Sequence, residues 1–277
     1  MRIFITGGNG QLGTALQQQL NHHDLFIADL PDVDISHRQQ LETAVCQAKP
    51  NIIIHCAAYT NVDGCAKDPE LAYKINGLGT QNVALICQER NIEMVHISTN
   101  EVFSGRDESG YNEWAPLNPN NPYGHSKAAA EHHVTRLLNK FYIVRSAWLY
   151  APEGKNFVHA ILHNARKNGQ IQVVTDEIGN PTYVHDLAVA ITQLIQTKQY
   201  GTYHLVNQGH CSRWEFANEI LKCAGLAHVK NRPILSTEFQ RLSTPPAFGH
   251  LHNVAGAAIG VKFRPWQEAL AEFIKNL

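Results

Sequence analysis

The chain opens with Met1-Arg2-Ile3-Phe4-Ile5-Thr6-Gly7-Gly8-Asn9-Gly10-Gln11-Leu12-Gly13, and this stretch decides the fold. Apolar residues over 2–6 predict a strand, and the glycines lead directly into a helical pattern over 11–20. Glycine allows a tight turn close to a phosphate, while a helix N-terminus offers unpaired N–H donors to an anion. The alternative is a turn that is merely rich in glycine. The G-x-x-G-x-x-G spacing in this context favours binding of a dinucleotide pyrophosphate by Gly7, Gly10, Gln11, Leu12 and Gly13.

Short apolar runs alternate with helical patterns through the first half of the chain. The next predicted strands cover 24–28, 51–56, 93–98 and 142–146, and the next predicted helices cover 39–47, 72–90 and 126–139. Strands that are apolar on both faces and alternate with helices predict a parallel sheet covered on both sides. We therefore expect an α/β fold with a doubly wound Rossmann sheet and a smaller C-terminal substrate-binding α/β domain.

The order of elements is less regular beyond residue 150. Short strands are predicted over 172–175 and 201–206, and helices over 213–224 and 266–275. We expect residues 1–146 to form the NAD(P)-binding domain and residues 147–277 to form mainly the substrate-binding domain. Part of 172–200 is expected to cross back to the first domain.

Composition excludes several classes of partner. The chain has 277 residues, 44% of them apolar, and a formal net charge of −1, so it has no basic field for nucleic acid or an anionic membrane. No apolar run approaches the roughly 20 residues that span a bilayer, and the glycine turn comes too early for a signal peptide. Six cysteines without a C-x-x-C pair and sixteen histidines without a paired motif indicate a cytoplasmic protein with no metal site.

Acidic residues after the second predicted strand bear on the choice of cofactor. Asp29 ends that strand, where a carboxylate can accept hydrogen bonds from an adenosine ribose. It would repel a 2′-phosphate, and no arginine follows it, so NADH is mildly favoured over NADPH. The alternative is that Asp29 only begins a turn. Asp34 and Ile35 are further candidates for cofactor contacts.

A catalytic pattern follows the fourth predicted strand. Tyr123-Gly124-His125-Ser126-Lys127 is Y-x-x-x-K at the start of a helix, so the phenol and the ammonium share one helical face. A nearby cation lowers the pKa of a tyrosine towards the range useful for proton transfer. Thr99 ends the strand, where its hydroxyl can hold a substrate oxygen. We predict Thr99, Tyr123 and Lys127 to be catalytic; the alternative for Tyr123 is packing at the helix start after Pro122.

Several motifs are spread in order over nearly the whole chain, at residues 7–13, 56–63, 98–103, 123–127, 145–150, 156–157 and 179–182. Together they resemble the dTDP-4-dehydrorhamnose reductase family of extended short-chain dehydrogenases/reductases, and residues 203–216 resemble the C-terminal half of that family. The resemblance implies an NAD(P)H-dependent oxidoreductase that reduces the C4 ketone of a dTDP-4-keto-6-deoxy sugar to dTDP-L-rhamnose.

The resemblance also implies roles for individual residues. Tyr123 would protonate the forming alkoxide, Lys127 would hold the cofactor ribose, and Thr99 would bind the ketone oxygen. Cofactor contacts are implied for Ala57, Ala58, Thr60, Tyr123 and Lys127, and substrate contacts for Asn100, Arg145, Trp148 and Asn156. Core packing is the alternative for Trp148, and a buried ion pair is the alternative for Arg145. Asn76 either braces the site or lies on a helix surface.

The sequence departs from the family pattern at three places. Thr99-Asn100-Glu101-Val102-Phe103 replaces the usual Thr-Asp-Tyr-Val-Phe, which leaves the precise sugar open. Pro245-Pro246 replaces an Arg-Pro pair and removes a possible substrate cation. Ala15 and His185 stand where some members carry acidic magnesium ligands at a dimer interface, so we expect a monomer or a dimer without a metal bridge.

Two alternative functions stay open. One is a nucleotide-sugar epimerase or dehydratase of the same fold; Glu101 matches the dehydratase pattern, but Asn100 replaces the acid that would precede it. The other is a non-catalytic NAD(P)-binding regulatory subunit, against which the intact Thr99, Tyr123 and Lys127 argue.

Overall fold

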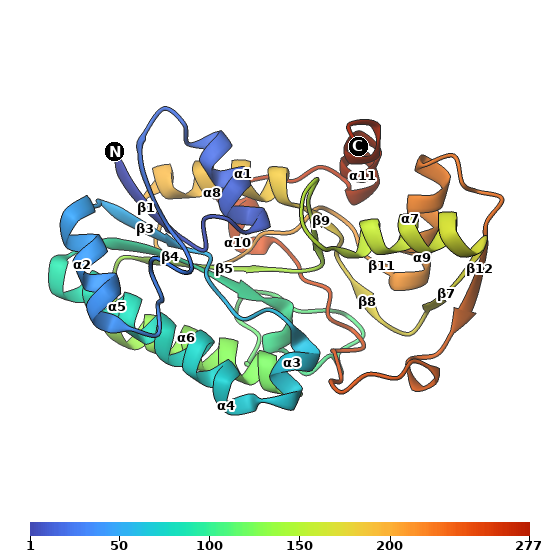
Figure 1. Ribbon diagram of the computed structural model, residues 1–277, viewed down its shortest axis with the longest axis horizontal. Helices are drawn as coiled ribbons and strands as arrows, with labels where there is room; N and C mark the ends of the chain where they lie inside the picture. The colour runs from blue at the N-terminus through green and yellow to red at the C-terminus, as the bar shows by residue number, and fades with distance from the viewer.

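The computed structural model describes residues 1–277, and its centre is a parallel sheet between two layers of helices (Figure 1). The six strands lie in the order β10-β5-β4-β3-β1-β2, and every neighbouring pair is parallel. Their bounds are β1 (Arg2–Thr6), β2 (Asp24–Ala28), β3 (Ile52–His55), β4 (Glu93–Thr99), β5 (Phe141–Ser146) and β10 (Gly201–His204). The chain runs outward on both sides of β1, which is the switch point where doubly wound sheets bind ligands. The predicted Rossmann sheet is confirmed.

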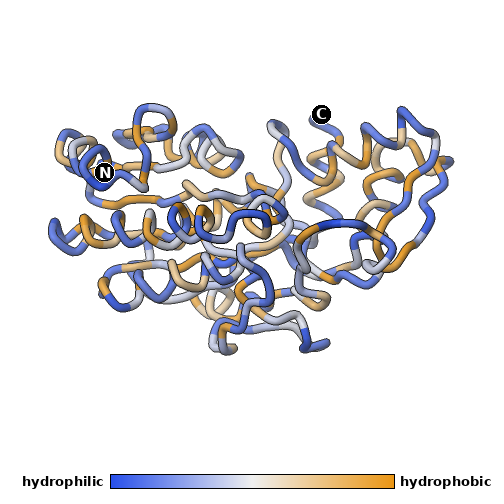
Figure 2. Tube along the Cα trace, turned by 60° about the horizontal axis from the view of Figure 1, so that its bottom comes forward, coloured by the Kyte–Doolittle hydropathy of each residue, from blue (hydrophilic) through white to orange (hydrophobic).

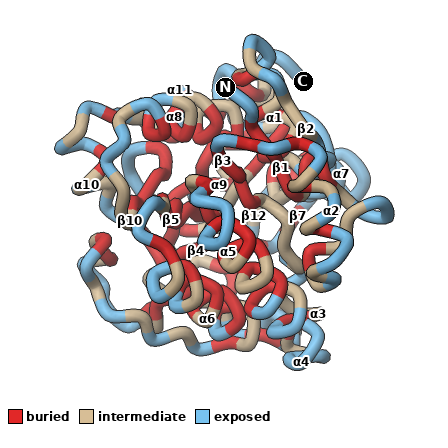
Figure 3. The backbone as a smooth tube through the Cα atoms, turned by 90° about the vertical axis from the view of Figure 1, so that its left-hand side faces the viewer, coloured by how far each residue is buried: buried red, intermediate tan, exposed pale blue.

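Alternation along each central strand fixes the two helix layers. Ile3 and Ile5 pack with α1 (Gln11–Gln19) and α8 (Val184–Thr197), whereas Phe4 faces the opposite layer. That layer comprises α2 (Arg38–Ala48), α5 (Gly79–Arg90) and α6 (Pro122–Leu137). Successive side chains of a strand point to opposite faces, so a strand covered on both sides must be apolar throughout. The strands are accordingly the hydrophobic, buried centre of the molecule (Figures 2 and 3).

A second, smaller core is built by the C-terminal part of the chain. Its helices are α7 (Phe157–Asn168), α9 (Arg213–Cys223) and α11 (Trp266–Lys275), which enclose Tyr150, Phe216 and Phe273. Strand β7 (Gln170–Val174) pairs in parallel with β12 (Lys230–Ile234) beside them. Short pairs join β6 (Leu149–Tyr150) to β9 (Thr182–Tyr183) and β8 (Ile178–Gly179) to β11 (Cys211–Ser212). Because α8 packs on the central sheet and β10 is an edge strand of it, the chain crosses back before it builds the rest of the second core. The domain boundary at residue 146 stays a prediction.

Some helices differ from those expected. Helix α6 begins at Pro122, four residues before the predicted start, because the Asn121 side chain accepts the N–H of Gly124 at 2.8 Å and caps it. The single helix expected over 72–90 is α4 (Pro69–Ala72), a π-helical segment η1 (Tyr73–Leu78) and α5. Four helices have no predicted counterpart: α3 (Val62–Lys67), α7, α8 and α10 (Val254–Ala258). Two short 3-10 turns, η2 (Asn100–Val102) and η3 (Ser236–Glu238), complete the chain. None of the helices has the length and apolar character that crossing a membrane requires.

Candidate active site

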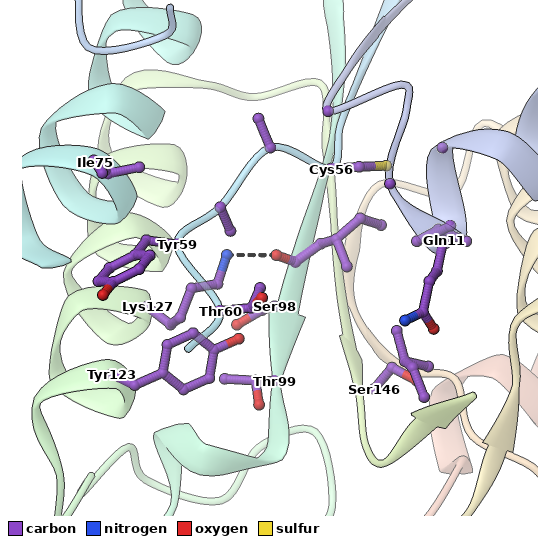
Figure 4. Close-up of a pocket in the computed structure, with 18 of the residues that line it drawn as sticks. Gln11, Cys56, Tyr59, Thr60, Ile75, Ser98, Thr99, Tyr123, Lys127 and Ser146 are labelled. Carbon is purple, nitrogen blue, oxygen red and sulfur yellow. Dashed lines mark hydrogen bonds between the residues drawn. The ribbon is translucent and has the colours of Figure 1, made fainter. Parts of the chain in front are cut away.

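A cavity of about 820 Å³ lies where the carboxyl ends of the central strands meet the smaller core (Figure 4). Its wall takes residues from the turns after β1 and β3, from β4 and from α6 on one side, and from the start of α9 on the other. Most of the predicted catalytic, cofactor-binding and substrate-binding residues lie together in this wall. They are Gly7, Gly10, Gln11, Leu12, Gly13, Asp29, Asp34, Ile35, Ala57, Ala58, Thr60, Thr99, Asn100, Tyr123, Lys127 and Trp148.

The glycine turn leaves no room for side chains. Gly7 has a φ of +66°, and a Cβ there would lie 2.6 Å from the backbone nitrogen of Ala57. A Cβ on Gly13 would lie 2.4 Å from the carbonyl oxygen of Gly7. Gly10 precedes α1 without a capping side chain, and the first turn of α1 has no acidic residue. The N–H donors of that turn are thus left for an anion, and the close backbone approach fits a dinucleotide pyrophosphate.

Asp29 joins the end of β2 to the glycine turn. One carboxylate oxygen accepts the N–H of Asn9 and the other accepts the N–H of Leu30, both at 2.8 Å. A carboxylate has further acceptor positions, and Asp29 also lines the cavity. The side chain therefore fixes a turn and at the same time offers an acceptor to a ribose.

Tyr123 and Lys127 lie one helical turn apart on α6 and face Thr99 at the end of β4 (Figure 4). The Lys127 ammonium donates to the carbonyl oxygen of Ile97 at 2.6 Å. The Thr99 hydroxyl accepts the N–H of Glu101 at 3.2 Å and donates to the Asn100 side chain at 3.3 Å. A phenol, a cation and a hydroxyl thus face one part of the cavity.

The protonation of this group differs from the expectation based on charge alone. Burial raises the pKa of Tyr123, the nearby Glu101 raises it further, and a hydrogen bond with Thr99 opposes them. The expected lowering of this pKa is therefore wrong for the chain by itself, because burial and the charge of Glu101 raise it. Burial also lowers the pKa of Lys127 to about 8, against the opposing charges of Glu131 and Cys56. At neutral pH the phenol keeps its proton, which is the state a proton donor needs.

Asn76 braces the catalytic helix from the π-helical segment. Its carbonyl oxygen accepts the N–H of Tyr59 at 2.7 Å, and its amide donates to the carbonyl oxygen of Tyr59 at 3.0 Å and to the hydroxyl of Ser126 at 2.9 Å. Ser126 lies between Tyr123 and Lys127 on α6. Asn76 is 1% exposed, which excludes the alternative of an ordinary helix-surface residue.

Two nominated residues are not brought to the cavity. Arg145 forms a buried ion pair with Glu131 at 2.7 Å and donates to the carbonyl oxygen of Glu113 at 3.1 Å. Asn156 caps α7: it accepts the N–H of His159 at 3.2 Å and donates to the carbonyl oxygen of Ala151 at 2.8 Å. Neither side chain lines the cavity, because each is held by hydrogen bonds that stabilise the fold.

Three charged residues of the wall, Glu101, Lys155 and Arg213, were not predicted to be site residues. Glu101 accepts the Asn121 amide at 2.6 Å, and burial raises its pKa. Arg213, the first residue of α9, enters the wall from the smaller core. Glu101 was visible as a departure from a pattern, whereas nothing in the local sequence of Arg213 indicates a binding residue. No group of three or more acidic, cysteine or histidine side chains is placed to hold a metal ion.

Known proteins resemble the chain over its full length. A family model described as the RmlD substrate binding domain matches residues 1–277. The spore coat polysaccharide biosynthesis protein SpsK of Bacillus subtilis (strain 168) is 34% identical over 99% of the chain and 97% of its own length. The dTDP-4-dehydrorhamnose reductase of Aggregatibacter actinomycetemcomitans is 32% identical over 97% of each chain.

Solved structures agree with these matches. The dTDP-4-dehydrorhamnose reductase of Bacillus anthracis in complex with NADP superimposes with a TM-score of 0.96, at 41% identity over 100% of this chain and 99% of that one. The UDP-glucose 4-epimerase of Thermus thermophilus in complex with NAD has a TM-score of 0.82 at 22% identity over 99% of this chain and 98% of that one, a likeness of fold alone.

Proposed function

The chain belongs to the RmlD substrate binding domain family, which contains the dTDP-4-dehydrorhamnose reductases, and from that premise we propose that it is an NAD(P)H-dependent reductase of a nucleotide-linked keto sugar. Its reaction reduces the C4 ketone of a dTDP-4-keto-6-deoxy sugar and yields dTDP-L-rhamnose. The observation that carries this proposal is a half-buried, protonated phenol that shares the cavity wall with an ammonium and a threonine hydroxyl.

Each of these three groups has a role in the reduction. When bound, the reduced nicotinamide supplies a hydride to the ketone carbon. Tyr123 donates its proton to the ketone oxygen, which becomes the new hydroxyl, and Thr99 holds that oxygen by a hydrogen bond. Lys127, fixed by the carbonyl of Ile97, places a positive charge near the phenolate that remains and binds the cofactor ribose. Solvent then returns the proton to Tyr123.

The remaining wall residues suit the cofactor and the sugar nucleotide. The first turn of α1 and its glycines bind the pyrophosphate, and Asp29 accepts hydrogen bonds from the adenosine ribose. Solved relatives bind NADP or NAD, and the chain uses NADPH or NADH. A mild preference for NADH, from the carboxylate of Asp29, is part of the proposal. Further cofactor contacts come from Asp34, Ile35, Ala57, Ala58 and Thr60, and sugar-nucleotide contacts from Asn100 and Trp148.

The proposal extends to the state of the protein in the cell. Ala15 on α1 and His185 on α8 supply no carboxylate for a magnesium ion, so we place the chain as a monomer or as a dimer without a metal bridge. All six cysteines are free thiols, which fits a reducing cytoplasm.

The test is direct. The protein is incubated with NADH or NADPH and the dTDP-, UDP- and GDP-linked 4-keto-6-deoxy sugars, and oxidation of the cofactor is followed by its absorbance. A reductase consumes one cofactor for each ketone reduced, with the dTDP sugar preferred. An epimerase would convert sugar with no net consumption, and a non-catalytic binding subunit would do neither; either result contradicts the proposal.

A further inference from the structure

The guanidinium of Arg213 is stacked on aromatic rings in the wall of the cavity. Its central carbon lies 3.7 Å from the centroid of the Trp148 ring and 5.1 Å from that of Phe157. Trp148 is itself closely packed, since a Cβ on Gly179 would come within 2.4 Å of the indole. The Arg213 side chain is 23% exposed and opens onto the cavity. A flat cation is therefore held in one place at the surface of an internal space.

The N–H donors of this guanidinium are free. A guanidinium carries several N–H donors in a planar fork, and none of those on Arg213 makes a hydrogen bond within the chain. The nearest carboxylate oxygen, on Glu177, lies 4.0 Å from its Nε, and Glu177 is already paired with Arg241. Arg145, by contrast, donates hydrogen bonds to the Glu131 carboxylate and to the carbonyl oxygen of Glu113. Arg213 is thus the arginine of this wall that is positioned for a ligand.

The guanidinium shares the cavity with the catalytic groups. Arg213, Tyr123 and Thr99 all line it, and Trp148, on which the guanidinium is stacked, is a proposed contact of the sugar nucleotide. The glycine turn that suits the cofactor pyrophosphate lies between β1 and α1 in the Rossmann half, whereas Arg213 begins α9 in the smaller core. An anion bound by Arg213 would therefore be part of the sugar substrate and not of the dinucleotide.

We propose that Arg213 binds the diphosphate of the sugar-nucleotide substrate and so selects nucleoside diphosphate sugars over free or singly phosphorylated sugars. This inference rests on the proposed function. The planar fork of arginine matches two phosphate oxygens at once. Stacking on Trp148 holds the fork in place before binding, so little side-chain entropy is lost when the ligand arrives.

Binding of nucleotide fragments tests the role of Arg213. Calorimetry on the NADP⁺-saturated protein measures the Kd of dTDP and of thymidine for the wild type, Arg213→Met and Arg213→Lys. Loss of charge-assisted hydrogen bonds is expected to raise the Kd of dTDP in Arg213→Met by about 10- to 100-fold. The Kd of thymidine should stay within about twofold of the wild-type value. The Kd of dTDP for Arg213→Lys should lie between those of the wild type and Arg213→Met. The matched control is Arg232→Met, which removes an exposed arginine of β12 and leaves both values unchanged.

An unchanged Kd of dTDP in Arg213→Met would overturn the inference. An equal loss of affinity for thymidine or NADP⁺ would also overturn it, because it would show that Arg213 has a structural role. Measurements of turnover distinguish failure of this inference from failure of the proposed function. If the wild type oxidises NADPH with the keto sugar and Arg213→Met keeps the same KM, the inference fails and the function stands. If the wild type shows Arg213-dependent binding of dTDP but reduces no keto sugar, the anion site stands and the reductase proposal fails.

Discussion

Replacing Tyr123 by phenylalanine removes one hydroxyl from the cavity wall and leaves the ring in place. Because the phenol is the proposed proton donor, we expect kcat to fall by about 100-fold or more. NADPH affinity, measured by fluorescence titration, should fall much less than kcat, since the variant removes at most one hydrogen bond to the cofactor and no charge. Turnover at the wild-type rate in Tyr123→Phe would show that the proton comes from another group.

The Lys127 ammonium predicts how activity depends on pH. Burial lowers its pKa to about 8, so the cation is present below that pH and is lost as the pH rises through it. We expect kcat/KM, which reports groups of the free enzyme, to fall above about pH 8. Lys127→Arg keeps the charge at higher pH and moves this decrease upward. An identical alkaline decrease in both proteins would assign it to a different group.

Arg145 is expected to affect stability and not substrate binding. Removing one partner of a buried ion pair leaves the other charge unpaired, so Arg145→Met should lower the free energy of unfolding by about 3–5 kcal/mol. Urea denaturation measures this change. The KM for the keto sugar should stay within about twofold, because Arg145 does not line the cavity. A raised KM in Arg145→Met together with wild-type stability would show instead that Arg145 binds the substrate.

The residues whose place in the cavity wall the sequence predicted are those that belong to a local pattern. Gly7 and Gly13 act within one turn, and Tyr123 and Lys127 act within one turn of helix, so their spacing alone places them. Arg213 reaches the cavity only because α9 packs against α7 in the second core, a contact that no local pattern encodes.

At the scale of elements, Asn121 connects the start of α6 to the active site. Its side chain accepts the N–H of Gly124 at 2.8 Å and donates to Glu101 at 2.6 Å. Asn121→Ala removes the cap, which is expected to cost about 1 kcal/mol of stability, and loosens the turn that carries Tyr123. We expect kcat to fall by roughly tenfold, since small displacements of a catalytic group are costly.

Asp68→Ala is the matched control for that variant. Asp68 caps α4 by accepting the N–H of Leu71 at 3.0 Å, and neither residue lines the cavity. Thermal unfolding should show a larger loss of stability in Asn121→Ala, which also loses the hydrogen bonds to Glu101 and Thr244, and kcat should fall only in that variant. Equal kcat in the two proteins would mean that the α6 cap does not position Tyr123.

Boundaries of elements were the part of the fold that the sequence predicted least well. Helix periodicity over 72–90 identifies the helical run but cannot distinguish the π-helical turns of η1 from α-helix. Those turns hold Asn76 where it reaches Tyr59 and Ser126. The hydrogen bonds that select this geometry come from the β3–α3 loop and from α6, so they exist only in the folded chain.

At the scale of the whole molecule, one segment connects the smaller core to the Rossmann half. After β12 the chain runs over residues 235–247 towards α3, as the orange segment in Figure 1 shows. There the Asp63 carboxylate accepts the N–H groups of Leu242 and Ser243 at 3.2 and 3.0 Å and the Ser243 hydroxyl at 2.9 Å. The next residue, Thr244, accepts the amide of Asn121 at 3.2 Å. Asp63 therefore helps to hold the two halves around the cavity.

Asp63→Ala should release that segment without touching the catalytic groups. Hydrogen bonds to a charged acceptor contribute about 1 kcal/mol or more, so we expect the KM for the keto sugar to rise by roughly fivefold with little change in kcat, and proteolysis within 235–247 to become faster. Burial alone would raise the pKa of Asp63, but the hydrogen bonds from Ser243 and Leu242 lower it. The attachment is therefore kept at neutral pH and lost only as the pH falls through this lowered pKa. Asp63→Asn retains an acceptor oxygen, so its KM should lie between those of the wild type and Asp63→Ala. If the KM of Asp63→Ala equals that of the wild type, the two halves stay together without this contact.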